Sequence, residues 1–225
     1  GINMNEAKII NLYDLNETIA ADYLKQFEYP WEALGGISDY IISLSKTLDL
    51  SEYDKIGEDI FIHKEAKVAK SSCLNGPLIV CRGAEIRHCA FIRGSAIVGE
   101  DAVVGNSTEL KNVILFNKVQ VPHYNYVGDS ILGYKAHMGA GSITSNVKSD
   151  KLNVIIKSGD KTIETNRKKV GAMLGDNVEV GCNSVLNPGT VLGKNVSVYP
   201  CSCVRGVIKE NSIYKKQGDI VIRNQ

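Results

Sequence analysis

A histidine and two cations are the residues of this sequence whose types and spacing could do chemistry. His123 follows Pro122. Imidazole side chains in general titrate near neutral pH, so a histidine can take a proton from an attacking amine. A lone histidine beside a proline is more often structural, and the pattern alone does not decide between the two. Arg93 and Lys111 could together hold a phosphate, or they could be a solvated pair. The repeat in which these residues lie bears on both questions.

Large apolar residues recur every six positions over most of the chain, often followed by glycine. Neither a helix nor a simple strand gives this period, whereas a triangular solenoid does, with one hexad on each flat side. The repeat predicts a mainly β fold, a left-handed parallel β-helix. Its inward positions are Ile56, Ile62, Val68, Leu74, Val80, Ile86, Ile92, Val98, Val104, Leu110, Phe116, Leu132, Met138, Thr144, Leu174, Val180, Leu186, Leu192, Val198 and Val204.

One coil of such a solenoid holds eighteen residues, which is also the separation between Arg93 and Lys111. We therefore expect the two side chains to stack on adjacent coils, about 4.8 Å apart. Like charges at that spacing repel each other unless an anion such as a phosphate lies between them.

The first fifty residues lack the hexad period. Asn16 could cap a short helix over 18–26, and apolar residues at helical spacing predict a second helix over 37–48. We expect residues 4–52 to form a helical cap over the open N-terminal end of the solenoid, and 53–225 to form the solenoid, with a last strand at 220–222.

The repeat is interrupted twice. Sixteen residues, rather than eighteen, separate Phe116 from Leu132, and His123 lies within that slip. The hexads then stop between Thr144 and Leu174, which predicts an excursion loop at about 147–173. This loop is rich in lysine and arginine, so it could be a lid over an anionic ligand or a solvated surface loop.

The composition excludes several classes of protein. Lys plus Arg (26) nearly equal Asp plus Glu (25), which argues against a nucleic-acid-binding surface. No apolar run is long enough to span a bilayer, and the start has no secretion signal. The six cysteines form no CxxC pair, so we expect reduced thiols and a cytoplasmic protein.

Three segments resemble the acetyltransferase half of the bifunctional N-acetylglucosamine-1-phosphate uridyltransferases and their archaeal sugar-phosphate relatives. The resemblance extends over roughly residues 56–207. It implies an acetyl-CoA-dependent N-acetyltransferase acting on an amino-sugar phosphate of the hexosamine 1-phosphate class, with no metal needed for acyl transfer. The segments are 93–112, 123–129 and 138–146.

The resemblance also implies roles for individual residues. His123 would be the general base, and Arg93 and Lys111 would hold the phosphate with help from the hydroxyl of Tyr126. The backbone N–H of Ala140 would stabilise the charge that develops on the thioester oxygen. His137 stands where the family has an asparagine that contacts the sugar. On the acetyl-CoA side, the resemblance implies contacts from Asn146 and from Val147, which replaces an aromatic residue. Two later positions where the family has small CoA-contacting residues are occupied by Cys182 and Pro200.

Other interpretations remain open. A non-catalytic sugar-nucleotide sensor or assembly subunit could keep the anchor and lack turnover. A zinc enzyme like the γ-class carbonic anhydrases would need three converging histidines, and the four here include no closely spaced pair. Fewer residues precede the solenoid than a nucleotidyltransferase domain needs. The resemblance further implies a homotrimer with sites between parallel prisms.

Overall fold

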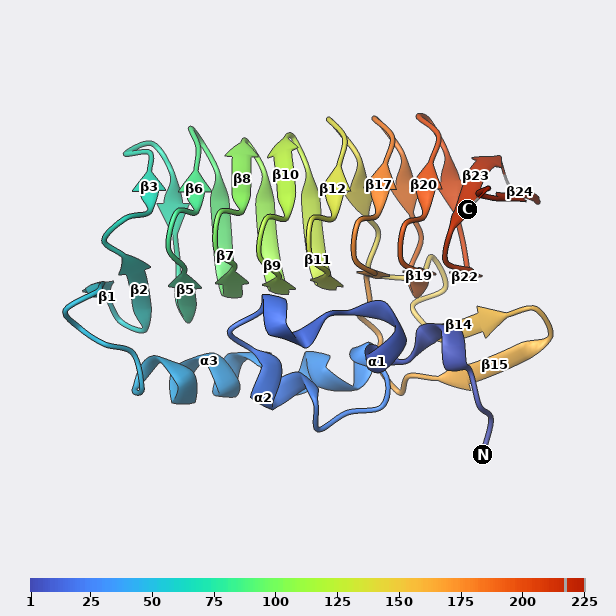
Figure 1. The fold of residues 1–225 in the computed structure, drawn as a ribbon, viewed down its shortest axis with the longest axis horizontal. Helices are drawn as coiled ribbons and strands as arrows, with labels where there is room; N and C mark the ends of the chain where they lie inside the picture. Colours follow the sequence, from blue (N-terminus) through green and yellow to red (C-terminus); the bar gives the residue numbers. More distant parts are fainter. Residues whose placement is uncertain (217, 225) are drawn as a thin grey trace.

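The chain winds into a three-sided left-handed parallel β-helix with a layer of short helices along one flank (Figure 1). The computed structural model describes residues 1–216 and 218–224. Two positions, 217 and 225, lie outside the described residues, and position 225 is the predicted end of the solenoid. The predicted fold class is confirmed.

Three faces, named here by order along a coil, make up the prism. The long strands β7, β9 and β11 turn a corner and contribute to both face 1 and face 2. The strands of face 1 are β4 (Cys73–Leu74), β7 (Phe91–Val98), β9 (Glu109–Leu115), β11 (Tyr126–Leu132), β13 (Ile143–Thr144), β18 (Val185–Leu186) and β21 (Cys203–Val204). Face 2 adds β2 (Ile60–His63), β5 (Leu78–Val80), β16 (Ala172–Leu174), β19 (Thr190–Leu192) and β22 (Val207–Ile208). Face 3 consists of β3 (Lys67–Val68), β6 (Glu85–Ile86), β8 (Val103–Asn106), β10 (Gln120–His123), β12 (His137–Met138), β17 (Glu179–Val180), β20 (Ser197–Val198) and β23 (Ser212–Lys216).

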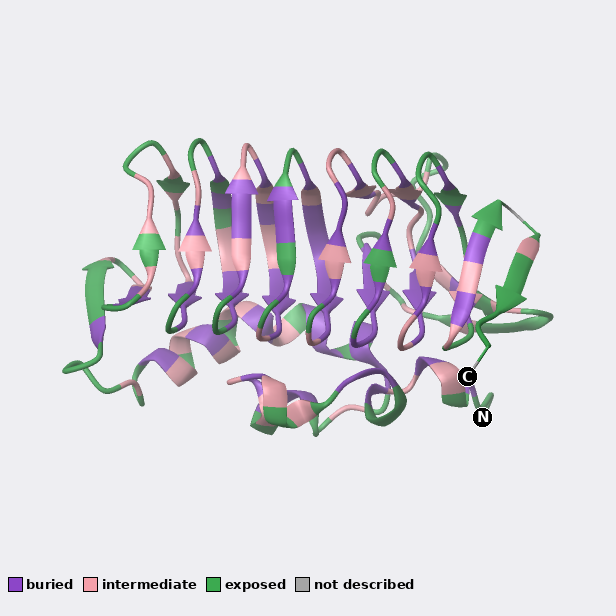
Figure 2. Cartoon of the chain, turned by 45° about the horizontal axis from the view of Figure 1, so that its top comes forward, coloured by how far each residue is buried: buried purple, intermediate pink, exposed green. Residues whose placement is uncertain are grey.

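The apolar hexad residues line the inside of the prism, where most of them are fully buried (Figure 2). Many corners are turned by non-glycine residues with positive φ, among them Asn112 and Asp129. Asparagine and aspartate tolerate this left-handed conformation better than most residues. The corners therefore depend on residue type as well as on glycine.

The middle coils are shorter than the repeat predicts. Val98 pairs with Leu115, and Leu115 pairs with Leu132, so each of these coils holds seventeen residues. The register shifts just before the corner between faces 1 and 2, where Ile92 pairs with Leu110 but Gly94 pairs with Lys111, and the next coil keeps the shortened register. The predicted slip in the segment around His123 is therefore wrong. Phe116 consequently leaves the inward row and packs against Tyr13, with ring centroids 5.0 Å apart and ring planes tilted by 33°.

The N-terminal helices lie along face 2 rather than over the N-terminal end of the solenoid, so the predicted placement of the cap is wrong (Figure 1). Face 2 carries apolar side chains on both sides of its strands, and the outward ones are as buried as the inward ones, as at Ile97, Ile114 and Ile131. Burying this second apolar row favours the flanking position. The helical elements are α1 (Ile9–Leu12), α2 (Ala21–Leu24), α3 (Ile37–Ser45) and 3₁₀ turns at Asn5–Ala7, Leu15–Glu17 and Pro30–Gly36.

The predicted helices are also shorter than expected. The helix proposed over 18–26 is reduced to α2, and Asn16 does not cap it. Instead, the carboxylate of Asp14 accepts a hydrogen bond from the Asn16 N–H at the preceding 3₁₀ turn. Asp176, buried on the solenoid, accepts hydrogen bonds from the backbone N–H groups of Asp14 and Tyr134 and so joins the helical layer to the coils.

The N-terminal end of the solenoid is closed by an antiparallel hairpin of β1 (Tyr53–Gly57) and β2. Ile56 lies on β1 and is 56% exposed, so the first predicted hexad is not part of the prism. At the other end, β24 (Asp219–Ile222) pairs antiparallel with β23, which confirms the predicted last strand.

The excursion forms an antiparallel hairpin of β14 (Ile155–Ser158) and β15 (Lys161–Glu164), and the solenoid resumes at β16. Val154, Ile156 and Val170 are fully buried, so the segment packs against the coils and is not a freely solvated loop. The Ser158 hydroxyl bonds to Glu6, which ties the hairpin to the N-terminal segment.

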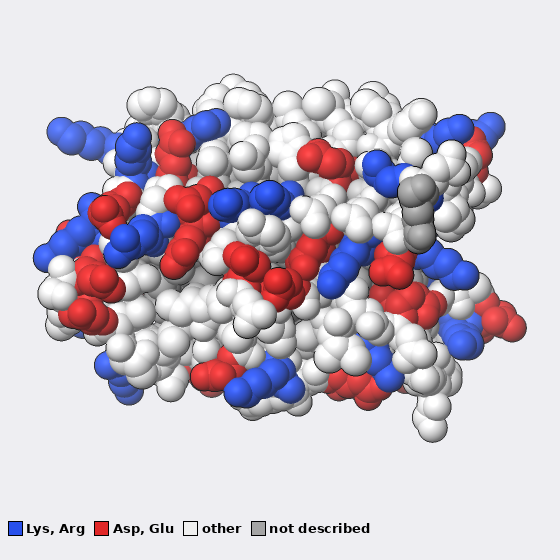
Figure 3. All heavy atoms as spheres, viewed as in Figure 1, with Lys and Arg blue, Asp and Glu red and all other residues white. Residues whose placement is uncertain are grey.

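Acidic and basic side chains are interspersed on the flank that carries the helices (Figure 3). Among the described residues, no helix is long and apolar enough to cross a membrane. All six cysteines are unpaired, and Cys81 alone of them is buried.

Candidate active site

His123 ends β10, where face 3 turns into face 1. It stands beside Asn106 of the preceding coil, and its carbonyl accepts the N–H of Gly141 from the following coil at 3.0 Å. Its side chain is exposed, so the imidazole is accessible from solvent.

The buried Asn125 links this turn to the Gly139–Ala140 turn on the next coil. Its Oδ1 accepts the His123 backbone N–H (3.1 Å), and its Nδ2 donates to the carbonyl oxygens of Gly139 and Ser142, both at 2.9 Å. The N–H and C=O of a trans peptide point in opposite directions. By holding the Gly139 carbonyl inward, Asn125 therefore directs the Ala140 N–H outward, on the coil beside His123.

A groove of about 400 Å³ runs over this corner and contains four of the predicted site residues. These are His123, His137, Ala140 and Cys182, which share the lining with Arg87 among others. The imidazole of His137 makes a 2.7 Å contact through Nδ1 with the Glu179 carboxylate on the next coil. The groove thus brings a solvent-accessible imidazole next to an outward-pointing backbone N–H.

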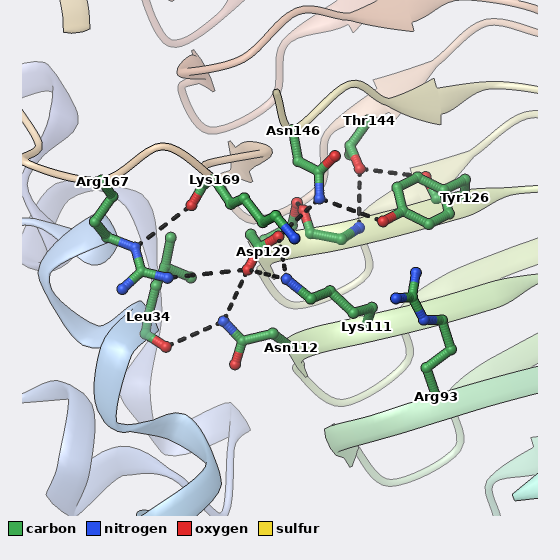
Figure 4. A network of polar contacts seen from close by, with 12 residues as sticks. Leu34, Arg93, Lys111, Asn112, Tyr126, Asp129, Thr144, Asn146, Arg167 and Lys169 are labelled. Carbon is green, nitrogen blue, oxygen red and sulfur yellow. Dashed lines mark hydrogen bonds and ion pairs between the residues drawn. The ribbon is translucent and has the colours of Figure 1, made fainter. Parts of the chain in front are cut away.

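A second cluster, which we call the Asp129 cluster, lies where face 1 turns into face 2 (Figure 4). The Asp129 carboxylate is 1% exposed and receives Lys111 Nζ at 2.9 and 3.1 Å, one distance to each oxygen. Asn112 Nδ2 donates to it at 3.0 Å, and Asn146 Nδ2 donates at 2.8 Å. Arg167, from the end of the excursion, comes within 4.0 Å. One buried carboxylate therefore collects groups from three coils and from the excursion.

The predicted stacking of Arg93 directly on Lys111 is not observed. Gly94 pairs with Lys111, and Arg93 occupies a bulge because the coil shortens at that corner. The Arg93 guanidinium bonds to Glu109 at 3.2 Å instead. Each cation thus has its own carboxylate, so neither depends on a ligand for charge balance.

Tyr126 lies on face 1 close to both groups of residues. Its hydroxyl accepts Asn146 Nδ2 at 3.3 Å. Burial, followed by the nearby Asp129 carboxylate, raises the pKa of the phenol. Tyr126 is three residues from His123, so their Cα atoms are at most about 11 Å apart. A ligand of the size of a sugar phosphate could therefore contact both.

The remaining predicted residues fall outside these two groups. Val147 forms an isolated bridge with Lys169 and lines a pocket beneath the excursion hairpin, away from the groove. Pro200 is exposed two coils beyond Ala140, on the same corner as Cys182. The structure brings Asn146 to the Asp129 cluster and not to the groove of His123.

Four residues of the site have no role predicted from the sequence: Asp129, Asn112, Arg167 and Asn125. For Asp129 and Asn112 the sequence does contain a signal, the two shortened hexads, because the loss of a residue near a corner indicates a non-standard turn. Arg167 and Asn125 act through contacts between segments far apart in sequence, which no local pattern indicates. Among the described residues, no three His, Cys, Asp or Glu side chains are grouped so as to hold a metal ion.

Residues 74–216 match the family model described as the GMPPB C-terminal domain. The bifunctional protein GlmU of Methanococcus maripaludis (strain C5) is 30% identical over 217 residues, which cover 96% of this chain and 53% of that protein. The bifunctional sugar-1-phosphate nucleotidylyltransferase/acetyltransferase of Sulfurisphaera tokodaii is 26% identical over 227 residues, 95% of this chain and 57% of that protein. The chain spans about half the length of these curated relatives. The family resemblance stated from the sequence is confirmed.

Solved structures also match, at low TM-scores. AntD, an N-acyltransferase from Bacillus cereus in complex with dTDP and 3-hydroxybutyryl-CoA, has a TM-score of 0.30 and 15% identity, and the match covers 81% of this chain and 88% of that one. The acetyltransferase domain of PglB from Neisseria gonorrhoeae in complex with acetyl coenzyme A has a TM-score of 0.28 and 14% identity, with 79% and 63% of the two chains covered.

Proposed function

Since the chain belongs to the family of the GMPPB C-terminal domain, and its relatives include a named nucleotidylyltransferase/acetyltransferase, we propose that it is an acetyl-CoA-dependent N-acetyltransferase. Its acceptor is an amino-sugar phosphate of the hexosamine 1-phosphate class. The observation that carries this proposal is the pairing of His123 with the outward Ala140 N–H across one corner, within reach of the Asp129 cluster.

The chemistry follows from this arrangement. His123 takes a proton from the acceptor amine as that amine attacks the carbonyl carbon of the thioester. Negative charge develops on the thioester oxygen and is stabilised by the Ala140 N–H, which Asn125 holds in direction before the substrate arrives. The C–S bond then breaks, and the thiolate leaves with the electron pair.

The phosphate of the acceptor binds Arg93 and Lys111, with the Tyr126 hydroxyl beside them. Both cations already have carboxylate partners, so the phosphate shares them with Glu109 and Asp129. This pairing keeps the cations ordered in the free protein, which lowers the entropy cost of binding.

Thiol release from acetyl-CoA, measured with a panel of hexosamine 1-phosphates, tests the proposal. We expect His123→Ala to lower kcat by about 10²- to 10⁴-fold, the usual contribution of general base catalysis. His88→Ala is the matched control, because His88 is also an exposed histidine on this side of the solenoid. Absence of turnover across the panel, with sugar nucleotide still bound, would instead indicate a sensor or assembly subunit.

We also propose a homotrimer of parallel prisms. Face 2 is buried under the chain's own helices, so faces 1 and 3 are the ones free to pack against other copies. Those two faces flank His123, and a site between copies would have the groove on one wall. Sedimentation showing a stable monomer would contradict this arrangement.

A further inference from the structure

A pocket of about 340 Å³ lies beneath the excursion hairpin and is separate from the groove of His123. The hairpin forms one wall, and the coils that carry β18 and β21 form the other. Its lining includes three cations and one carboxylate, Lys148, Lys157, Arg205 and Asp150, together with polar groups of Ser145 and Asn187.

The charges of this pocket, called here the hairpin pocket, do not cancel. Lys148 pairs with Asp150 at 3.4 Å. In the part of the chain that the structure describes, Lys157 and Arg205 form no ion pair, so the lining carries a net charge of +2, from three cations less one anion. A phosphate monoester carries close to two negative charges at neutral pH, and it would be neutralised by such a pocket.

The location of the pocket indicates which phosphate it would take. Along face 1, Tyr126 is followed on successive coils by Ile143, Val185 and Cys203, and Arg205 comes two residues later. Three strand spacings separate the first and last of these coils, about 14 Å. This is too far for the phosphate of an acceptor held at Lys111, but it suits the far end of a long second substrate.

The surface between the two sites is suited to an apolar arm. The outward side chains of face 1 beyond Tyr126 are Ile143 and Val185, both half-buried and uncharged. We propose, on the basis of the acetyl-CoA-dependent function above, that the hairpin pocket binds the 3′-phosphate of the acyl donor while its pantetheine arm lies along face 1. The segment that interrupts the hexad repeat thereby contributes to donor binding.

Calorimetric titration of coenzyme A and of 3′-dephospho-coenzyme A tests this assignment. We expect Lys157→Gln and Arg205→Gln each to weaken binding of coenzyme A about tenfold, the worth of one charge-assisted hydrogen bond. Binding of 3′-dephospho-coenzyme A to each variant should stay within about twofold of its binding to wild type. This compound lacks the 3′-phosphate, so removing the cation that would contact that phosphate costs it no interaction. Lys151→Gln is the matched control: it removes a charge from the same segment outside the pocket lining and should leave both affinities unchanged.

The outcomes separate this inference from the proposed function. Equal weakening of both compounds by the pocket variants, or no weakening of either, would overturn the 3′-phosphate assignment while leaving the acetyltransferase proposal intact. Weakened binding of a sugar nucleotide, with coenzyme A unaffected, would assign the pocket to the acceptor and overturn the inference. A wild-type protein that binds no coenzyme A would overturn both. Unfolding temperatures matching that of wild type would show that the variants are folded.

Discussion

The two corners that flank face 1 are built by different rules. At the corner between faces 3 and 1 the hexad spacing is kept, and His123 and the Gly139–Ala140 turn stand side by side as neighbouring repeats. At the corner between faces 1 and 2 two coils lose a residue, and Asn112 and Asp129 turn the chain with positive φ. The regular corner presents backbone groups and one imidazole, whereas the shortened corner collects charge around a buried carboxylate. The repeat can align peptide groups, but gathering four polar side chains on one carboxylate required a departure from it.

Removing the charge at the shortened corner should have the largest effect. Asp129→Asn keeps a residue that tolerates positive φ but leaves Lys111 and Arg167 without their common partner. Loss of one member of a buried pair costs about 3–5 kcal/mol, and we expect about 3 because both cations are partly exposed. Denaturant unfolding measures this loss, and kinetics should show a raised KM for the sugar phosphate with kcat little changed.

Asp101→Asn is the control for that change. Asp101 also turns a corner with positive φ, but it is exposed, so the same substitution should cost less than about 0.5 kcal/mol. Equal losses in the two variants would mean that corner geometry, and not the carboxylate network, stabilises the shortened corner.

The regular corner should respond in the opposite kinetic sense. Asn125→Ala removes the contacts that hold the His123 backbone and the Gly139 carbonyl, and leaves buried groups unpaired. We expect a stability loss of about 2 kcal/mol. Asn125 orients the groups proposed to be catalytic and does not touch the proposed phosphate anchor. We therefore expect kcat to fall at least about tenfold while KM for the sugar phosphate stays near that of wild type.

Comparing kcat and KM between Asp129→Asn and Asn125→Ala tests the division of roles between the two corners better than either variant does alone. If Asn125→Ala raised KM and Asp129→Asn lowered kcat, the assignment of catalysis to one corner and anchoring to the other would be reversed. If both variants changed both constants alike, the two corners would act as one unit.

The same contrast explains what could be predicted from the sequence. The solenoid follows from a local six-residue period that the coils repeat, whereas the position of His123 at the end of a regular strand does not, because the count placed it inside the slip. The bulge at Arg93 could not be predicted, because the residue missing opposite it lies one coil later, between Leu110 and Lys111, and the hexad count alone does not locate it. The placement of the helices along face 2 could not be predicted either, because the short strands of this face are apolar on both sides, so the outward row, as at Ile114, cannot be distinguished from the inward row. Contacts such as that of Arg167 with Asp129 depend on how the excursion folds back.

The smallest expected effect on stability concerns the contact between the tip of the excursion hairpin and the N-terminal segment, which is separate from the Asp129 cluster. The hydrogen bond from the Ser158 hydroxyl, first among several causes, lowers the pKa of the Glu6 carboxyl below 4.5. The ionised form is thus favoured in the folded protein, so its contribution to stability is present above pH 4.5 and is lost as pH falls through the lowered pKa. Ser158→Ala should cost about 0.5 kcal/mol at pH 7, because a partly exposed contact is weakened by solvent.

Thermal unfolding of wild type and Ser158→Ala over a series of pH values measures this contribution. The difference between the two unfolding temperatures should shrink as the pH is lowered from 7 through the lowered pKa of Glu6, since protonated Glu6 no longer favours the native contact. The sugar-phosphate KM of the variant should equal that of wild type, because Asn146 and Arg167 hold the base of the excursion independently of its tip. A raised KM in Ser158→Ala would mean that the phosphate anchor at the shortened corner depends on the whole hairpin. The anchor and the hairpin pocket would then not be independent binding sites.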